Sequence, residues 1–349
     1  MRILQVITRT DAGGAQMVAA LLANELVNKG HDVTLVAGHG DGTIWKWIDE
    51  KVKRIECPCL LREISPVNDL KAFLELRKIY IKVNPDIIHL HSSKVGILGR
   101  LAFPRNKTVF TVHGFDRIGL GRKVLESIMQ FRCSAIVGVC ENDKKNLLSA
   151  GVNRNVTFVY NGIQKPLDTK PQMWNIPSTY KKFILCVARL EPQKNHRLYF
   201  ETAKLLPDYA FVWIGNTMPV KDHPENVFFL GTLPSASLYC QYCDLFCLPS
   251  NYEGLPMTII EAMSYGKPVV SSNVGGVSEI VRNDVNGYVL NNEAKEFASK
   301  IQYIVENPDV YEIMSTNSKS IFENELTVDS MANGYLKIYE KVRNFESFQ

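Results

Sequence analysis

Short runs of apolar and β-branched residues alternate along this chain with segments whose apolar residues recur at helical spacing. In the first half the predicted strands occupy residues 2–8, 32–37, 86–91, 107–112 and 135–139. Between the first two strands, residues 15–29 repeat valine and leucine at helical spacing, and Gly30 ends the pattern. Strands that alternate with helices in this way predict a parallel sheet with crossover helices.

The same alternation starts again in the second half of the chain. Its predicted strands occupy residues 183–187, 210–214, 227–230, 245–248 and 268–271. Helical patterns over residues 294–305 and 328–342 close the chain. Residues 165–182, between the two series, contain three prolines and show no sustained period, as expected of a linker.

The two series predict two α/β domains, each a doubly wound Rossmann-like fold. We place the N-terminal domain at residues 1–165 and the C-terminal domain at residues 166–327, and the last helix, about 328–349, can pack back on the first domain. A length of 349 residues suits two packed domains. Ligands bind at the carboxyl ends of strands in open α/β sheets, so we expect a site in a cleft where the two domains face each other.

Composition adds a cellular location and an asymmetry of charge. With 46% hydrophobic and 22% charged residues and no run of eighteen apolar residues, the chain is expected to be cytoplasmic. Residues 1–165 carry 24 basic and 15 acidic side chains, a net charge of +9, whereas the remainder carries 16 and 21, a net charge of −5. The basic half suggests an anionic partner, a lipid phosphate or membrane surface rather than nucleic acid; the alternative is a solvated distribution with no partner.

Eight cysteines raise the question of a metal site, because Cys240, Cys243 and Cys247 are closely spaced. No second pair with ligand spacing follows them, and their apolar neighbours are typical of a buried strand. We therefore expect reduced, buried thiols and no metal.

Two loops after predicted strands carry residues suited to phosphate. Gly13 and Gly14 follow the first strand and open the first helix, where free backbone amides can approach an anion. The third glycine of a dinucleotide fingerprint is missing, which argues against NAD, and a plain tight turn is the alternative. Arg189 and Lys194 follow the first strand of the second domain, where they can bind a diphosphate unless they belong to a solvated loop.

The stretch NYEGLPMTIIEAMSYGKPVV, residues 251–270, contains an acid in an unexpected place. A helix is predicted over residues 256–265, because proline suits its first turn and Gly266 its end. Glu261 lies among apolar residues that cover most of this helix, and a buried carboxylate requires a partner. That partner is either a bound ligand or an internal arginine or lysine.

A second acid precedes the same helix. Glu253, Gly254 and Leu255 form the loop at its N-terminus, where unpaired amides attract phosphate. Glu253 and Glu261 are expected to lie on the order of 10 Å apart. Because carboxylates accept hydrogen bonds from vicinal hydroxyls, the two acids suit a sugar and a ribose on either side of a diphosphate.

Jointly these motifs resemble the retaining glycosyltransferases of family 4, which have the GT-B fold of two Rossmann-like domains facing across a cleft. The resemblance covers nearly the whole chain and rests on Glu253-x7-Glu261, the Gly13-Gly14 loop, the Arg189 and Lys194 pair, YNGI at 160–163 and GGVSEIV at 275–281. The chain departs from the family pattern at Ala188, where a glycine often precedes the arginine.

The resemblance implies transfer of a hexose or N-acetylhexosamine from a nucleotide-diphosphate sugar, such as a UDP-sugar, to a saccharide or polyprenyl-linked acceptor in polysaccharide biosynthesis. It implies retention at the anomeric carbon and neither cofactor nor metal. The chain has no Asp-x-Asp pair, so cations are expected to neutralise the leaving diphosphate. A sugar-nucleotide epimerase of similar fold and a non-catalytic nucleotide-sugar-binding subunit are the alternatives.

The resemblance also assigns roles to residues. Those that bind the donor are Arg189 and Lys194 at the diphosphate, Glu253 with the amides of Gly254 and Leu255 at the transferred sugar, Glu261 at the ribose, Gly215, and the loop from Gly231 to Leu233 at the base. Gly13 and Gly14 approach the phosphate from the other domain, and His113 lies beside the reacting sugar. The alternative for His113 is a strand-end histidine that bonds to backbone.

A basic and apolar segment in the first half suggests where a membrane would be contacted. It interleaves Arg117, Arg122 and Lys123 with Ile118, Leu120, Val124 and Leu125. Such a segment is expected to rest on anionic lipid head groups at the inner face of the plasma membrane, which would suit a lipid-linked acceptor.

Overall fold

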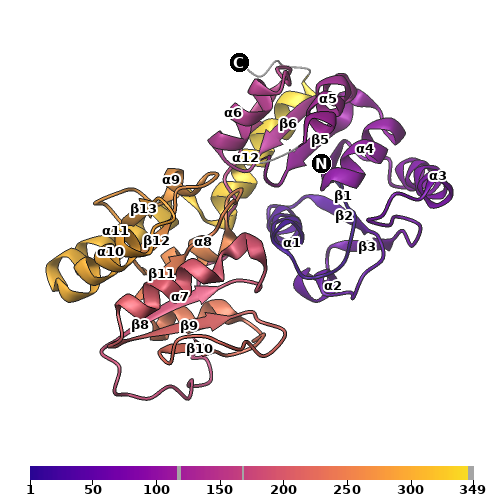
Figure 1. Cartoon of the computed structure of the whole chain (residues 1–349). Coiled ribbons are helices and arrows are strands. Elements are labelled where there is room, and N and C mark those ends of the chain that lie inside the picture. The colour runs from indigo at the N-terminus through magenta and orange to yellow at the C-terminus, as the bar shows by residue number, and fades with distance from the viewer. Residues whose placement is uncertain (116–118, 167–168, 345–349) are drawn as a thin grey trace. The chain divides into compact units, whose positions relative to one another are not determined.

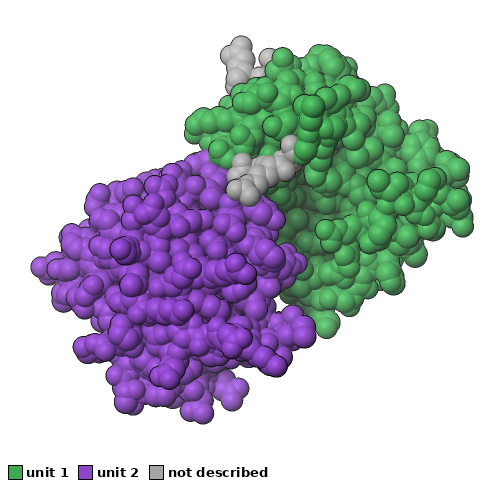
Figure 2. All heavy atoms as spheres, in the orientation of Figure 1, with its two compact units in different colours: residues 1–164, 328–349 green, residues 165–327 purple. Residues whose placement is uncertain are grey.

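The computed structural model describes residues 1–115, 119–166 and 169–344. The chain divides into two compact units, one of residues 1–164 with 328–349 and the other of residues 165–327 (Figures 1 and 2). Each is an α/β unit built around one parallel sheet, so the predicted fold class is confirmed. In the described part of the chain, no helix combines the length and apolarity that crossing a bilayer requires.

Unit 1 contains a seven-stranded parallel sheet in the order β3-β2-β1-β4-β5-β6-β7. Its strands are β1 (Arg2–Ile7), β2 (Asp32–Ala37), β3 (Lys53–Glu56), β4 (Ile87–His91), β5 (Thr108–Val112), β6 (Ala135–Gly138) and β7 (Val156–Phe158). The central strands β4, β5 and β6 are buried along their whole length, which explains their largely apolar sequences. The edge strands β3 and β7 were not predicted, because β3 is mostly charged and β7 is short and half-exposed.

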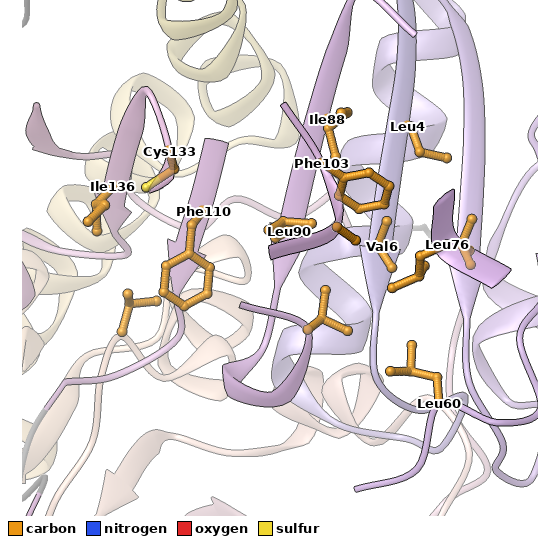
Figure 3. Packing of buried hydrophobic residues seen from close by; sticks show 14 of the residues in the cluster. Leu4, Val6, Leu60, Leu76, Ile88, Leu90, Phe103, Phe110, Cys133 and Ile136 are labelled. Carbon is orange, nitrogen blue, oxygen red and sulfur yellow. The ribbon is translucent and has the colours of Figure 1, made fainter. Parts of the chain in front are cut away.

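Helices cover both faces of this sheet. They are α1 (Gly14–Asn28), α2 (Ile44–Trp47), α3 (Pro66–Val83), α4 (Ser93–Ala102), α5 (Leu120–Met129), α6 (Glu141–Ser149) and α12 (Val328–Arg343). Helix α3 packs beside α4, and both close over a hydrophobic cluster that includes Leu4, Leu90 and Phe110 (Figure 3). Because successive strand residues alternate between faces, the neighbours of these residues point to the opposite face.

Helix α12 packs against α1 in unit 1, although its sequence follows that of unit 2 (Figure 1). The backbone N–H of Val328 donates to the carbonyl of Ile163 at 2.8 Å. Tyr335 and Tyr339 are one turn apart on α12, are fully buried, and hydrogen-bond to residues of β5 and β4. The last helix is therefore part of the core of unit 1.

Unit 2 contains a six-stranded parallel sheet in the order β10-β9-β8-β11-β12-β13. Its strands are β8 (Lys182–Val187), β9 (Tyr209–Ile214), β10 (Val227–Phe229), β11 (Leu245–Leu248), β12 (Val269–Ser272) and β13 (Gly287–Leu290). Its helices are α7 (His196–Leu205), α8 (Met257–Ser264), α9 (Val277–Ile280), α10 (Ala294–Glu306) and α11 (Pro308–Glu325).

The predictions for unit 2 and for the cysteines need correction. Strand β13 and helix α11 were missed, the latter because its exposed side is almost entirely polar and its apolar period is weak. Helix α8 begins one residue later than predicted, since Pro256 has an extended ψ of 120° and is the N-cap. The thiols of Cys240, Cys243 and Cys247 are buried, as predicted, but Cys59 in unit 1 is only partly buried.

Candidate active site

Two loops at the carboxyl edge of the unit 2 sheet are bonded to each other along their backbones. Strands β8 and β11 are neighbours, so the loops that follow them meet although they lie about sixty residues apart. The backbone N–H of Asn251 donates to the Gln193 carbonyl at 2.8 Å, and its side-chain amide donates to the Pro192 carbonyl at 2.9 Å. The Gln193 amide donates in return to the Tyr252 carbonyl at 2.9 Å.

These bonds hold Lys194 against Glu253. The Nζ atom of Lys194 lies 2.5 Å from Oε1 of Glu253, and both side chains are largely removed from water. A pair of this kind is stabilising only while both partners remain, because either charge alone would be poorly solvated. The structure therefore joins two residues that the sequence presented in separate motifs.

Arg189 does not take part in the ion pair between Lys194 and Glu253. Its side chain is 72% exposed and forms an ion pair with Glu191 of its own loop, at 3.0 Å. An exposed pair of this type contributes little to stability. The guanidinium can consequently exchange Glu191 for another anion at small cost.

A third loop, after β12, supports the backbone of Glu253. The N–H of Gly276 donates to the Gly254 carbonyl at 2.8 Å. Gly275 has a φ of +55°, and a Cβ atom at this position would lie 2.0 Å from the Glu253 carbonyl oxygen. The first glycine of the GGVSEIV motif therefore permits a close backbone contact that no other residue allows.

Helix α8 starts directly after Gly254, Leu255 and Pro256, and Pro256, its N-cap, makes no capping hydrogen bond through its side chain. Glu261 lies on this helix and is partly buried. Burial raises the pKa of its carboxyl to about 7. Within residues 1–115, 119–166 and 169–344, no lysine or arginine forms an ion pair with Glu261, which disfavours the alternative of an internal cation.

Gly215 and Leu233 lie in the loops after β9 and β10, on the other side of β8. The N–H of Gly215 donates to the Gly231 carbonyl at 2.7 Å, and the Gly231 N–H donates to Oδ1 of Asn216 at 2.9 Å. Asn216 thus orders the loop predicted to meet the base, a role that the sequence analysis missed. The signal was available, since an asparagine directly follows a strand and a glycine.

In unit 1 the predicted residues also follow strands. Helix α1 begins at Gly14, which is exposed, and Gly13 is an N-cap without a side-chain hydrogen bond. His113 follows β5 directly and is partly buried. Burial lowers the pKa of His113 to about 4, so its imidazole is neutral at pH 7.

His113 has a partner that sequence reasoning missed. Its Nε2 atom lies 3.2 Å from Nδ1 of His91, the last residue of β4. The sequence contains a signal for this contact, because His89 and His91 interrupt an otherwise apolar strand on alternate positions. Two histidines on one face of a buried strand require polar neighbours.

Comparisons with known proteins identify the family. Residues 12–165 match the family described as Glycosyltransferase Family 4, and residues 168–321 match Glycosyl transferases group 1. The chain belongs to the family 4 glycosyltransferases, and the suspected family and glycosyl-transfer activity are thereby confirmed.

Two relatives illustrate the similarity in sequence. The chain is 28% identical to the UDP-Gal:alpha-D-GlcNAc-diphosphoundecaprenol alpha-1,3-galactosyltransferase of Escherichia coli, over 90% of each chain. It is 24% identical to the N,N'-diacetylbacillosaminyl-diphospho-undecaprenol alpha-1,3-N-acetylgalactosaminyltransferase of Campylobacter jejuni, over 80% of this chain and 83% of that protein.

Solved structures share the fold. A crystal structure of Anabaena Alr3699/HepE in complex with UDP and glucose has a TM-score of 0.80 at 19% identity, covering 98% of this chain and 100% of that chain. Sucrose-phosphate synthase from Thermosynechococcus elongatus has a TM-score of 0.82 at 17% identity, covering 99% and 100%.

The contact between Gly275 and Glu253 predicts a large loss of stability on adding one methyl group. Gly231→Ala provides a matched control, since Gly231 has a φ of +75° but a Cβ added there would meet no atom of the described residues within 4 Å. The control is expected to lose about 1 kcal/mol from backbone strain alone. Gly275→Ala is expected to lose about 3 kcal/mol, because the Glu253 carbonyl must also move. Urea unfolding followed by circular dichroism measures both, and equal losses would contradict the crowding.

Proposed function

We propose that this glycosyltransferase moves a hexose or N-acetylhexosamine from a nucleotide-diphosphate sugar to a lipid-linked saccharide, with retention and without a metal. The observation that carries the proposal is the Lys194–Glu253 pair at the carboxyl edge of the unit 2 sheet, next to the N-terminus of α8. A cation, a carboxylate and the backbone amides of a helix N-terminus at one edge match a diphosphate with a hydroxyl-rich sugar attached.

The donor is assigned to residues of unit 2. The diphosphate is placed at Lys194 and Arg189, whose exposed guanidinium exchanges Glu191 for phosphate oxygens. The transferred sugar is placed at Glu253 and the amides that follow it, and the ribose at Glu261. The loop that Asn216 orders, from Gly231 to Leu233, together with Gly215, is placed at the base.

The chemical class of donor and acceptor follows from the relatives. Their names specify UDP-galactose as one donor, and saccharides joined by diphosphate to undecaprenol as acceptors. We propose the same class for this chain, with a UDP-sugar as donor and a diphospho-polyprenyl saccharide as acceptor, in synthesis of a surface polysaccharide on the cytoplasmic side of the membrane.

The proposed reaction needs no ionised histidine. The bond from the anomeric carbon to the diphosphate oxygen breaks while a bond to the acceptor oxygen forms on the same face. The acceptor hydroxyl gives its proton to the departing diphosphate oxygen, and Lys194, Arg189 and the amides of Gly13 and Gly14 stabilise the charge that develops there. His113, neutral at pH 7, is placed beside the reacting sugar as a hydrogen-bonding group.

Loss of Glu253 or Arg189 tests this assignment. Glu253→Ala and Arg189→Ala are each expected to reduce transfer by about 100-fold, the typical effect of removing one electrostatic contact to the transition state. Transfer is measured from UDP-galactose and UDP-N-acetylgalactosamine to a synthetic diphospho-polyprenyl GlcNAc. Asp208→Asn is the control, because it breaks an exposed ion pair with Lys181 in the same unit, at the amino end of β8.

Undiminished turnover in a folded Glu253→Ala variant would refute the assignment. The alternatives give different results in the same system. An epimerase would exchange a donor proton with heavy water in the absence of acceptor, and a non-catalytic subunit would bind the donor without any turnover.

The raised pKa of Glu261 predicts that donor affinity depends on pH. Only the ionised carboxylate accepts hydrogen bonds from both ribose hydroxyls, so affinity for UDP-galactose is expected to rise about tenfold from pH 6 to pH 8, as a pKa of about 7 is crossed. Without ligand, the same raised pKa makes folding stability fall as pH rises from about 4.5 through 7, because the native carboxyl holds a proton that the unfolded chain releases. Titration calorimetry should show the pH dependence in the wild type and its absence in Glu261→Gln.

We further propose that unit 1 contacts an anionic membrane through α3 and α5. The exposed residues of α3 are Pro66, Val67, Leu70, Lys71, Leu74, Arg77, Lys78, Ile81 and Lys82, and none of them is acidic. In the segment from α5 to residue 132, the exposed residues are Leu120, Gly121, Lys123, Val124, Ile128, Phe131 and Arg132, again without an acid. Apolar and cationic residues on one helix face are the pattern of a helix that lies in the membrane interface.

The two helices belong to one layer. Helix α4 lies between them, since α3 packs on α4 and Arg100 of α4 forms a buried ion pair with Glu126 of α5 at 2.7 Å. By contrast, α11 in unit 2, also eighteen residues long, exposes Glu312 and Glu323 among other polar residues. In α5, the only acid among the described residues, Glu126, is buried in its pair with Arg100 and is therefore absent from the surface that would meet anionic lipid.

The sequence-based assignment of the membrane segment is corrected in part. Leu120, Lys123 and Val124 are exposed, as it requires. Arg122 and Leu125 are partly buried, and Arg122 donates a hydrogen bond to Ser93. Arg117 and Ile118 lie outside the described residues.

Removing charge from α3 should weaken membrane binding. Lys71→Gln with Lys78→Gln is expected to lose about 2 kcal/mol, roughly thirtyfold, of affinity for vesicles rich in phosphatidylglycerol. The control Lys295→Gln with Lys319→Gln makes the same charge change at exposed positions of α10 and α11. Vesicle co-sedimentation measures both, and equal weakening by the two pairs, or no binding by the wild type at low salt, would contradict the proposal.

A further inference from the structure

Three histidine rings form a row on one face of the unit 1 sheet. His89 and His91 are two residues apart on β4, so their side chains lie on the same face. The His91 ring centroid is 4.0 Å from that of His89 and 5.5 Å from that of His113, to which it is stacked at 29°. This face is opposite to the one that holds the hydrophobic cluster with Leu90 and Phe110.

One end of the row is fixed by hydroxyl groups. Nδ1 of His89 lies 2.7 Å from the Tyr339 hydroxyl, and Nε2 lies 2.7 Å from the Thr111 hydroxyl. The Thr111 hydroxyl lies in turn 3.1 Å from that of Tyr335. Both nitrogens of His89 are therefore satisfied, and its ring is a fixed surface against which His91 packs.

Only one of the two nitrogens that face each other between His91 and His113 carries a proton. Burial lowers the pKa of both imidazoles below the ordinary value, that of His113 to about 4, so each ring is neutral at pH 7. A neutral imidazole carries one N–H and one bare nitrogen. Across the 3.2 Å between Nδ1 of His91 and Nε2 of His113, one ring donates and the other accepts.

The other nitrogen of His91 shows which ring donates this hydrogen bond. Its Nε2 atom is buried and has no hydrogen-bond partner in the described part of the chain. A buried N–H without a partner is rarer in native proteins than a buried acceptor without one. The proton of His91 is therefore on Nδ1, where it has an acceptor.

We infer that His91 is a positioning residue for the transfer reaction: its Nδ1–H donates to Nε2 of His113 and fixes His113 in the tautomer protonated on Nδ1. In this tautomer His113 presents an N–H rather than a bare nitrogen to its ligand. No protein group among the described residues accepts a hydrogen bond from that N–H. The catalytic consequence rests on the proposed role of His113 beside the reacting sugar, whereas the hydrogen bond and the tautomer do not.

This arrangement suits a group that stabilises developing negative charge by donating a hydrogen bond, and that does not itself transfer a proton. A fixed N–H donates to an oxygen of the sugar or diphosphate, where negative charge grows as the bond to the anomeric carbon breaks. A freely rotating ring would present either nitrogen and would lose part of this contact. The row of rings explains why a buried strand keeps two histidines despite the cost of burying polar groups.

Long-range ¹H–¹⁵N correlation spectra of the ligand-free protein test the tautomer, because they distinguish protonated from bare ring nitrogens. The wild type is expected to show His113 protonated on Nδ1 alone. His91→Leu should give a mixture of tautomers, and His91→Asn, whose side-chain N–H replaces that of His91, should restore the single form. Tyr339→Phe is the control, since it removes a hydroxyl bonded to His89 but leaves the His91–His113 contact.

Kinetics with UDP-galactose test the consequence. His91→Leu is expected to lower kcat by up to about 100-fold, the effect of misplacing a reacting group, with KM changed less than about threefold. His91→Asn should recover most of kcat. A wild-type His113 protonated on Nε2, or a His91→Leu variant with unchanged tautomer and kcat, would overturn the inference. If the tautomer is as expected but His113→Ala keeps full turnover, the role of His113 in the proposed function fails and the hydrogen bond stands.

Discussion

All strands in each sheet of this protein run in one direction, and the placement of every candidate site residue depends on this constraint. The loops that carry Lys194, Glu253 and Gly275 follow β8, β11 and β12, three strands that are adjacent in the sheet. Parallel order therefore brings them to one edge without any further interaction. In unit 1 the same rule places His91 and His113 at the ends of the adjacent strands β4 and β5.

The charges at these edges are arranged in two different ways. Lys194 and Glu253 neutralise each other in a largely buried pair, so a ligand that separates them must supply both an anion and hydrogen-bond donors. Glu261 forms no ion pair with a cation among the described residues, and burial raises the pKa of its carboxyl to about 7. A bound ligand can therefore determine whether this carboxyl is ionised at neutral pH. His113 is neutral for the same physical reason, and a neutral ring donates a hydrogen bond without acting as an acid.

In unit 1, buried apolar side chains and buried polar side chains lie on opposite faces of one sheet. The face with Leu90 and Phe110 is closed by α3 and α4, and the exposed residues of α3 are mainly apolar and basic. The opposite face contains the row of histidines and is closed by α12, through Tyr335 and Tyr339. The final helix thus satisfies a buried nitrogen of His89 and the Thr111 hydroxyl as well as filling space, which accounts for its place in the unit in which the chain began.

The sequence alone determined most of the strand and helix pattern, the order of the motifs and hence the family. Hydrophobic period reports local burial, and a central strand such as β4 or β11 is recognisable because both of its faces are buried. The charged edge strand β3 and the polar helix α11 lack this signal and were missed. The base and the sugar of the proposed donor also have no local signal in the sequence, because the base is proposed to meet backbone groups such as those around Gly231.

Tertiary structure decided which side chains meet. In the sequence, Lys194 and Glu253 belong to two separate motifs, and Arg189 and Lys194 are equally good candidates for binding a diphosphate. The pairing of the two loops largely buries Lys194 and leaves Arg189 exposed. The contact of His91 with His113 likewise requires the register of β4 against β5. Such contacts depend on strand order and loop backbone over long separations in the chain. A local pattern can show that a residue needs a polar partner, as for His91, but it does not identify the partner.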